Sequence, residues 1–366
     1  MQLTVFRVMT ELGERPRRVL RAIVMEFIES GEPVGSRTLG KKYGIAVSPA
    51  TIRNVMADLE ESGFLSQPHT SAGRLPTEKA FRLYIDSLMT LADLSGDEEA
   101  EIRTIDDLSP GLALFRESSR ILSRLAGTVS VILAPCSRRR RLREIHFVVP
   151  TSTDSVLLAV LLFADGTIES RMVEVQEVPD DAELERMHNR LIEQVRGKTL
   201  QQLRNELASA LRRDRIVLDK LTRQAFELGL LATEGAQDPV VMIEGQSRLI
   251  SQPGFGDVQV LRDMLQTLEE RERLLVLLDR TILAKTVQVL VGNEAELGHG
   301  SLSFVTAAFL DGDTALGSIG VIGPTRMNYS RVVSLVQATA AAVSDVHARA
   351  SADNMLAGKP RLAVSI

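Results

Sequence analysis

The sequence predicts an α+β, multidomain protein, and three observations carry that prediction. The chain has 366 residues, 44% of them apolar, which is enough for the cores of two or three domains. Its first ninety residues alternate helical stretches with turn signals and end in a short hairpin, the pattern of an N-terminal winged helix-turn-helix. Further along, strand-type stretches are interrupted by a helical block and then resume, which predicts an antiparallel sheet domain with a mostly helical inserted domain.

Charge is unevenly divided along the chain. The net charge is −5, but residues 1–90 hold 12 Lys and Arg against 10 Asp and Glu, a net of +2, and the remainder has a net of −7. A mildly basic module on an acidic body fits DNA binding coupled to sensing or oligomerisation. The single cysteine, Cys136, excludes an internal disulfide framework and a Cys-rich zinc site.

The hydropathy of the chain indicates neither a membrane-spanning segment nor an N-terminal export signal. Charged residues such as Arg7 and Glu11 interrupt any apolar stretch at the N-terminus. The longest apolar run, Val156–Ala164, has nine residues, far fewer than the roughly 20 that span a bilayer. We therefore expect a soluble cytoplasmic protein.

The first two helices are predicted from spacing and caps. Apolar residues at helical spacing between Val19 and Ile28 predict an amphipathic helix that ends near Ser30 and Gly31. Ser36 is the expected N-cap of a short second helix, which ends at Gly44.

The third helix carries the functional prediction. Ser48 is its expected N-cap and Pro49 its first residue, and the stripe Ile52, Val55, Met56 and Leu59 faces the core. The opposite face presents Ala50, Arg53, Asn54 and Ala57. Arginine and asparagine suit bidentate contacts with guanine and adenine edges, and the helix N-terminus with Ser48 and Thr51 suits a phosphate. The alternative is an ordinary surface helix whose polar residues are only solvated.

A hairpin follows the third helix. The pattern predicts two short strands, Phe64–Gln67 and Arg74–Leu75, around a turn-rich tip. At this hairpin, Thr70, Ser71 and Arg74 could reach a phosphate or the minor groove. Thr77 then caps a further helix. The candidate DNA contacts are Ser36, Arg37, Ser48, Ala50, Thr51, Arg53, Asn54, Thr70, Ser71 and Arg74.

The rest of the chain mixes strands and helices. Residues 93–110 are acidic and are interpreted as a hinge or solvated linker, and a helix is expected near 112–125. Strands are expected near 129–134, 142–149, 156–164 and 168–175, which look like one antiparallel sheet, and again near 240–243, 286–291, 301–309 and 315–322. Helices are expected over 180–234, near 258–270 and near 330–350.

Other candidate sites are weaker. The basic run Arg138–Arg141 with Arg143 fits a solvated loop better than a DNA contact, and Cys136 fits a buried, inert thiol better than a redox switch. The histidines lack partners at metal spacing, and no nucleophile–base pair is present in the pattern. We therefore expect no catalytic residues, no metal and no cofactor.

Four short strings occur in order in the first ninety residues: Pro33–Leu39, Ser48–Asn54, Met56–Glu60 and Thr70–Thr77. Through these strings the chain closely resembles the HrcA family of bacterial heat-inducible transcription repressors. The family usually has a Gly-Tyr pair where this chain has Ala80-Phe81, past the tip that would face DNA. Gly317–Pro324 also resembles the last strand of a GAF-type sheet, although its residues alone indicate only a glycine-containing strand.

This resemblance implies an architecture and a regulatory circuit. It implies a winged helix, a GAF-like domain and an insert that forms a homodimer contact. It also implies an inverted-repeat operator upstream of chaperone operons, and activity that depends on the chaperonin GroEL until heat-damaged proteins draw GroEL away. The expected boundaries are 1–92 for the winged-helix domain, 93–110 for the acidic linker, 111–178 and 258–350 for the GAF-like domain, 179–257 for the inserted dimerisation domain and 351–366 for a flexible tail.

The leading hypothesis is a dimeric, non-enzymatic repressor that binds double-stranded DNA in the bacterial cytoplasm, at the nucleoid. The alternative is a metabolite-responsive regulator that senses a small ligand through its GAF-like domain. A third hypothesis, an enzyme whose winged helix only mediates interactions, is disfavoured because no catalytic constellation is visible.

Overall fold

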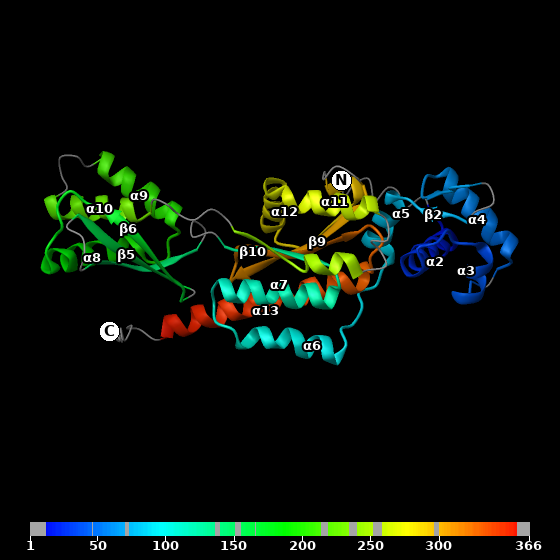
Figure 1. Cartoon of the computed structure of the whole chain (residues 1–366), viewed down its shortest axis with the longest axis horizontal. Helices are drawn as coiled ribbons and strands as arrows, with labels where there is room; N and C mark the ends of the chain where they lie inside the picture. The colour runs from blue at the N-terminus through cyan, green and yellow to red at the C-terminus, as the bar shows by residue number, and fades with distance from the viewer. Residues whose placement is uncertain are drawn as a thin grey trace.

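The computed structural model describes residues 12–45, 47–69, 73–135, 140–150, 155–164, 166–213, 219–233, 240–251, 258–295 and 300–356. They form an elongated molecule with three parts in a row (Figure 1). Described residues within 12–88 are called the head, those within 89–135 and 240–356 the body, and those within 140–233 the insert. All described strand pairs are antiparallel, which confirms the prediction of a mixed α and β protein with antiparallel sheets.

The head contains helices followed by a short hairpin, as predicted. The first helix ends where Gly31 adopts a left-handed φ of 75° and its N–H donates to the Phe27 carbonyl. The hairpin pairs Leu65 with Pro76. The elements are α2 (Glu14–Ser30), α3 (Ser36–Lys42), α4 (Pro49–Glu61), β1 (Leu65–Ser66), β2 (Leu75–Pro76) and α5 (Glu78–Leu83), which continues into the π-helical turn η1 (Tyr84–Leu88).

The predicted acidic linker is wrong. Residues within 93–110 form α6 (Gly96–Arg103) and the 3₁₀ turn η2 (Thr104–Asp107). Ser95 and Glu98 form a capping box at the start of α6. Ile102 and Ile105 are buried, and the Arg331 guanidinium donates to Glu98 Oε1 over 2.7 Å. Because two isoleucines face inward and Glu98, itself buried, pairs with Arg331, the segment packs on the body as an ordered helix.

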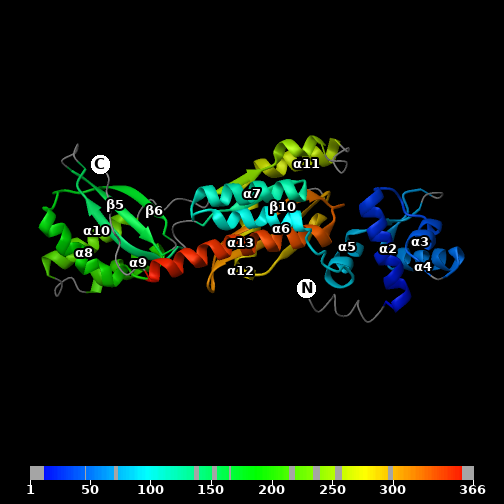
Figure 2. The ribbon, with the colours of Figure 1, turned by 90° about the horizontal axis from the view of Figure 1, so that it is seen from below.

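The body is a five-stranded sheet with helices on both faces. Its strand order is β7-β3-β10-β9-β8. Helices α7 and α13 pack on one face, and α6 packs on the outer side of these two helices (Figure 2), while α11 and α12 pack on the other face of the sheet. The elements are α7 (Leu112–Ala126), β3 (Val129–Leu133), β7 (Val241–Glu244), α11 (Val258–Glu269), α12 (Arg271–Ala284), β8 (Gln288–Val291), β9 (Leu302–Asp311), β10 (Thr314–Pro324) and α13 (Tyr329–Leu356).

The insert has a sheet of its own, so the predicted strands near 142–175 do not belong to the body sheet. Strand order in this second sheet is β4-β5-β6, and its helices pack on one face around a separate apolar core. The helical segment expected at 179–257 is therefore only the second half of a mixed unit. The elements are β4 (Leu142–Val148), β5 (Val156–Phe163), β6 (Ile168–Glu174), α8 (Asp181–Val195), α9 (Leu200–Arg213) and α10 (Lys220–Ala232).

Two further differences concern helices. Residues 271–284, left unassigned from the sequence, form α12. Helix α13 runs on to Leu356, so the start of the expected flexible tail at 351–366 is helical. Among the described residues, no helix is long and apolar enough to cross a membrane.

Candidate nucleic-acid interface

The N-terminus of α4 is capped as predicted. The Thr51 backbone N–H donates to Ser48 Oγ over 3.1 Å, and the hydroxyl groups of Ser48 and Thr51 lie 2.9 Å apart. Pro49 is the first helical residue, where its missing N–H costs no hydrogen bond. Ser48 and Pro49 are both exposed, so this positively polarised helix end is open to solvent and to an anion.

Helix α4 is amphipathic, with a buried apolar stripe on one side and an exposed face on the other. Its inner stripe is buried, with Ile52 fully covered and Leu59 at 1% exposure. The stripe packs on α2 and α3. On the other side, Arg53 and Asn54 are exposed together with the small residues Ala50 and Ala57. This face therefore offers two hydrogen-bonding side chains on a surface with no bulky neighbour from its own helix.

Helix α3 contributes a second exposed strip, but not through Ser36. The N-cap is Gly35 and makes no side-chain cap bond, and Ser36 is buried in the first turn, so the predicted cap at Ser36 is wrong. Arg37 is exposed as predicted. Lys41 is exposed as well and follows Arg37 by one helical turn, a spacing that could have added it to the candidate contacts.

Lys42, by contrast, is engaged within the head. Its ammonium group donates to Glu26 Oε2 over 2.8 Å and to Glu29 Oε2 over 2.6 Å. The hydrogen bond from Lys42 holds the pKa of Glu26 below its usual value against the opposing effect of burial. The pair joins α3 to α2, so we assign Lys42 a structural role.

The hairpin is fastened to the helices at its base. Thr77 Oγ1 donates to the carbonyls of Gly63 and Phe64, over 2.8 and 3.1 Å. The backbones of Val34 and Arg74 exchange two hydrogen bonds of 2.9 Å. A Cβ on Gly73 would come within 2.5 Å of the Val34 carbonyl oxygen, so glycine is required at this crossing.

The structure describes only one of the three predicted contacts in the hairpin, Arg74. Arg74 Nε lies 2.8 Å from Glu60 Oε2, and the Arg74 side chain is only 19% exposed, so its guanidinium is turned toward α4. Thr70 and Ser71 lie outside the part of the chain that the structure describes. Of the predicted contacts that the structure describes, Arg37, Ser48, Ala50, Arg53 and Asn54 are therefore exposed on α3 and at the start of α4, and Thr51 is half-buried.

The basic run in the insert is not a comparable surface. Arg140 is buried, pairs with Glu169 at 3.1 Å and lies 4.8 Å from the centre of the Phe163 ring. Arg141 donates to the Gly197 carbonyl. Arg138, Arg139 and Cys136 are not among the described residues. The members that are described thus stabilise the insert.

Comparisons with known proteins agree along nearly the whole chain. The family description "HrcA protein C terminal domain" matches residues 113–333. A relative from Sorangium cellulosum, named heat-inducible transcription repressor HrcA, is 46% identical over 347 residues, which cover 93% of this chain and 99% of the relative. A relative of the same name from Geobacter sulfurreducens is 40% identical over 344 residues, covering 92% and 98%.

A solved structure shares the fold. A crystal structure described as that of a hypothetical protein covers 93% of this chain and is itself covered to 99%, with a TM-score of 0.56 and 21% sequence identity. At this identity the likeness concerns the fold alone.

Proposed function

Because this chain belongs to the HrcA family of heat-inducible transcription repressors, we propose that it represses heat-shock chaperone operons by binding an inverted-repeat operator as a homodimer. The observation that carries the proposal is the exposed face of α4, where Arg53 and Asn54 stand beside a capped, solvent-open helix N-terminus. In this reading the head is a winged helix-turn-helix, and α4 enters the major groove.

The residues on α3 and α4 have distinct roles in this proposal. Arg53 and Asn54 read base edges, because a guanidinium and a carboxamide each form paired hydrogen bonds with guanine and adenine. Ala50 lets the helix backbone approach the groove. The hydroxyl groups of Ser48 and Thr51 and the positively polarised N-terminus of α4 face a phosphate, while Arg37 and Lys41 add sequence-independent attraction.

The insert supplies the dimer contact in this proposal. Strand β5 is apolar on both faces, and its helix-side residues Leu157, Ala159, Leu161 and Phe163 are all completely buried. Its other face carries Leu158 and Val160, half-buried, beside Met172 of β6, which is 62% exposed. An apolar sheet face of this kind is typical of a surface that associates with a second copy.

Family resemblance extends the proposal to regulation. GroEL would keep the repressor active, and heat-damaged proteins would compete for GroEL and so release the operator. The protein acts without catalysis and without a cofactor, in the cytoplasm and on the nucleoid.

A titration tests the proposal directly. Fluorescence anisotropy would follow the purified protein on an inverted-repeat duplex from a chaperonin promoter and on a scrambled duplex, at two salt concentrations, with and without GroEL. We expect a preference of about a thousandfold or more for the repeat and a steep loss of affinity with salt. Equal, weak binding to both duplexes would refute the operator proposal and favour a ligand-responsive regulator, whose effector would then be sought by its stabilising effect on melting.

A further inference from the structure

Helix α5 joins the head to the body through the Glu78 carboxylate, which lies against two glycines of the body. Glu78 Oε1 accepts hydrogen bonds from the Asn293 backbone N–H, over 3.2 Å, and from Asn293 Nδ2, over 2.9 Å. A Cβ on Gly292 would lie 2.2 Å from this oxygen, and one on Gly300 would lie 3.1 Å from it. Both glycines have left-handed φ angles, of 56° and 49°, which favour glycine, and a side chain at Gly292 would displace the Glu78 carboxylate.

One turn later, Arg82 makes a second set of contacts with the body. Its Nη1 donates to the Val289 carbonyl over 2.7 Å and to Glu294 Oε2 over 3.0 Å, while Nη2 donates to Asp86 over 2.8 Å. Glu294 Oε2 also accepts the Val291 backbone N–H over 3.0 Å. The Arg82 side chain is 19% exposed, so these are partly desolvated contacts and stronger than ordinary surface pairs.

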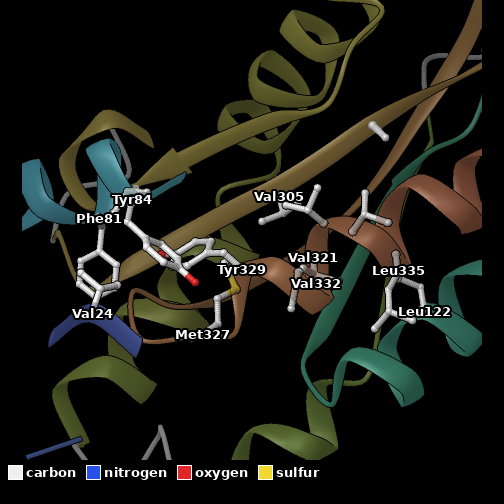
Figure 3. Packing of buried hydrophobic residues seen from close by; sticks show 14 of the residues in the cluster. Val24, Phe81, Tyr84, Leu122, Val305, Val321, Met327, Tyr329, Val332 and Leu335 are labelled. Atoms are coloured by element: carbon white, nitrogen blue, oxygen red, sulfur yellow. The ribbon is translucent and has the colours of Figure 1, made fainter. Parts of the chain in front are cut away.

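A third contact comes from the body toward the head. The Arg326 guanidinium lies against Gly31 at the end of α2, where a Cβ would come within 1.3 Å of Arg326 Nη1. Between the head and the body, Phe81 packs on Tyr329, with 5.9 Å between ring centroids (Figure 3). The joint thus consists of an aromatic contact together with polar contacts made by α5 and by the end of α2.

Because the head contacts the body at several separate points, these contacts restrict the rotation of the head relative to the body as well as its separation from the body. A single aromatic contact would let the head turn about it, whereas Glu78 and Arg82, one helical turn apart on α5, bind β8 and the residues that follow it. In a dimer that binds an inverted repeat, the distance and angle between the two recognition helices set the half-site spacing that fits.

We propose that the part of this joint formed by Glu78, Arg82 and the segment Val289–Glu294, at the end of β8 and just beyond it, is a positioning element that fixes the half-site spacing accepted by the dimer. The inference rests on the proposed function. Glu78 and Arg82 touch no DNA in this assignment and act only through the orientation of the head. Loss of the joint should therefore broaden the range of accepted spacings without weakening the binding of one head to one half-site.

The experiment uses the full-length protein and a series of inverted-repeat duplexes whose central spacer is lengthened or shortened one base pair at a time, with a single half-site duplex as reference. We expect the unaltered protein to lose about tenfold or more in affinity when the spacer changes by two base pairs. The double variant Glu78→Ala, Arg82→Ala should vary by less than about threefold over the same series. Its affinity for the single half-site should stay the same.

Two matched variants separate positioning from folding. Glu78→Gln keeps an acceptor oxygen for Asn293 and should retain the sharp spacer preference. Arg349→Ala removes an arginine that pairs with Asp106 inside the body, at 2.8 Å, and should also retain it. If the double variant does not fold, as judged by circular dichroism, Glu78→Ala alone serves in its place.

The outcomes are distinguishable. A folded joint variant with an unchanged, sharp spacer preference would overturn the positioning role. An unaltered protein that does not prefer the repeat over a scrambled duplex would instead refute the proposed function on which the inference rests.

Discussion

The aromatic rings of Phe81, in the head, and Tyr329, at the start of α13 in the body, lie 5.9 Å apart at an interplanar angle of 57°. Phe81 also packs on Phe27 of α2, with 6.2 Å between centroids. The Tyr329 hydroxyl donates to the Thr325 carbonyl over 2.7 Å and lies 2.8 Å from Ser303 Oγ. These rings join the buried core of the head to the body core on the α7 and α13 side of the sheet in one continuous cluster, visible from Val24 to Leu335 in Figure 3.

The first prediction concerns this shared core. Phe81→Ala removes a ring that touches both sides, so we expect the free energy of unfolding to fall by about 3–5 kcal/mol. Because the core is continuous, head and body should still unfold in one transition in calorimetry, at a lower temperature. Leu112→Ala, at a residue that is 59% exposed, is the control and should change the melting temperature little. A loss confined to a separate low-temperature transition of the head would show that the two cores are not coupled.

Base reading by α4 gives the second prediction. Arg53→Ala and Asn54→Ala should each reduce discrimination between the operator and a variant base pair by about 1–3 kcal/mol, roughly 5- to 150-fold. Lys41→Ala should weaken binding to all sequences alike and reduce the salt slope by about 1. Anisotropy titrations with matched and mismatched duplexes measure both effects. Unchanged operator affinity in the folded Arg53→Ala, Asn54→Ala double variant would exclude α4 as the recognition helix, and a uniform loss would assign these residues to phosphates.

Helix capping gives the third prediction. Ser48→Ala removes the acceptor for the Thr51 N–H and should destabilise the protein by about 1 kcal/mol. Ser48→Asp restores a cap acceptor and should recover that stability. The two variants should differ in operator affinity. A carboxylate beside a phosphate is repelled, so Ser48→Asp should bind the operator more weakly than Ser48→Ala. Equal operator affinity of the two variants would place Ser48 away from the phosphate backbone.

The open face of the insert sheet gives the fourth prediction. Met172→Glu places a charge on the apolar face and should dissociate the dimer at micromolar concentration, as measured by sedimentation velocity. Operator affinity should then fall by a factor of 10² or more, because the second head no longer binds intramolecularly. Leu283→Glu, at a 79% exposed residue of α12 in the body, is the matched control and should leave the association state unchanged. If the dimer persists in both Met172→Glu and Leu158→Glu, this sheet face is not the dimer interface.

The fifth prediction is a pH dependence at α6. Hydrogen bonding by the Ser95 backbone N–H, followed by the Arg331 contact, lowers the pKa of Glu98 against the opposing effect of burial. A carboxyl group whose pKa is lower in the folded state stabilises the fold above its unfolded pKa, and this contribution is lost as the pH falls through the folded pKa. Glu98→Gln should therefore lower the melting temperature at pH 7, and the difference should shrink as the pH falls below about 4.3, the ordinary pKa of a glutamate. A difference that stays constant with pH would assign the effect to packing alone.

Much of the head could be predicted from the sequence because its signals are local. A serine before a proline and an apolar stripe at helical spacing were sufficient to predict the start and the inner face of α4, and both are present. The exposed positions of Arg53 and Asn54 followed from the same spacing. The sequence did not reveal which polar side chains pair across elements. It could not show that Arg74 turns to Glu60, that Lys42 joins α3 to α2, or that Ser36 lies inside the first turn of its helix.

The sequence by itself therefore determined the type of most elements, the amphipathic character of α4 and, through its motifs, the family. Only the tertiary structure decided that strands β4 to β6 form their own sheet, that the acidic stretch packs as α6, and that Glu78 and Arg82 join the head to the body. The reason is physical. Spacing along the chain records which face of an element is apolar, but the surface that covers that face comes from residues up to hundreds of positions away, and the choice between surfaces depends on how their shapes and charges fit.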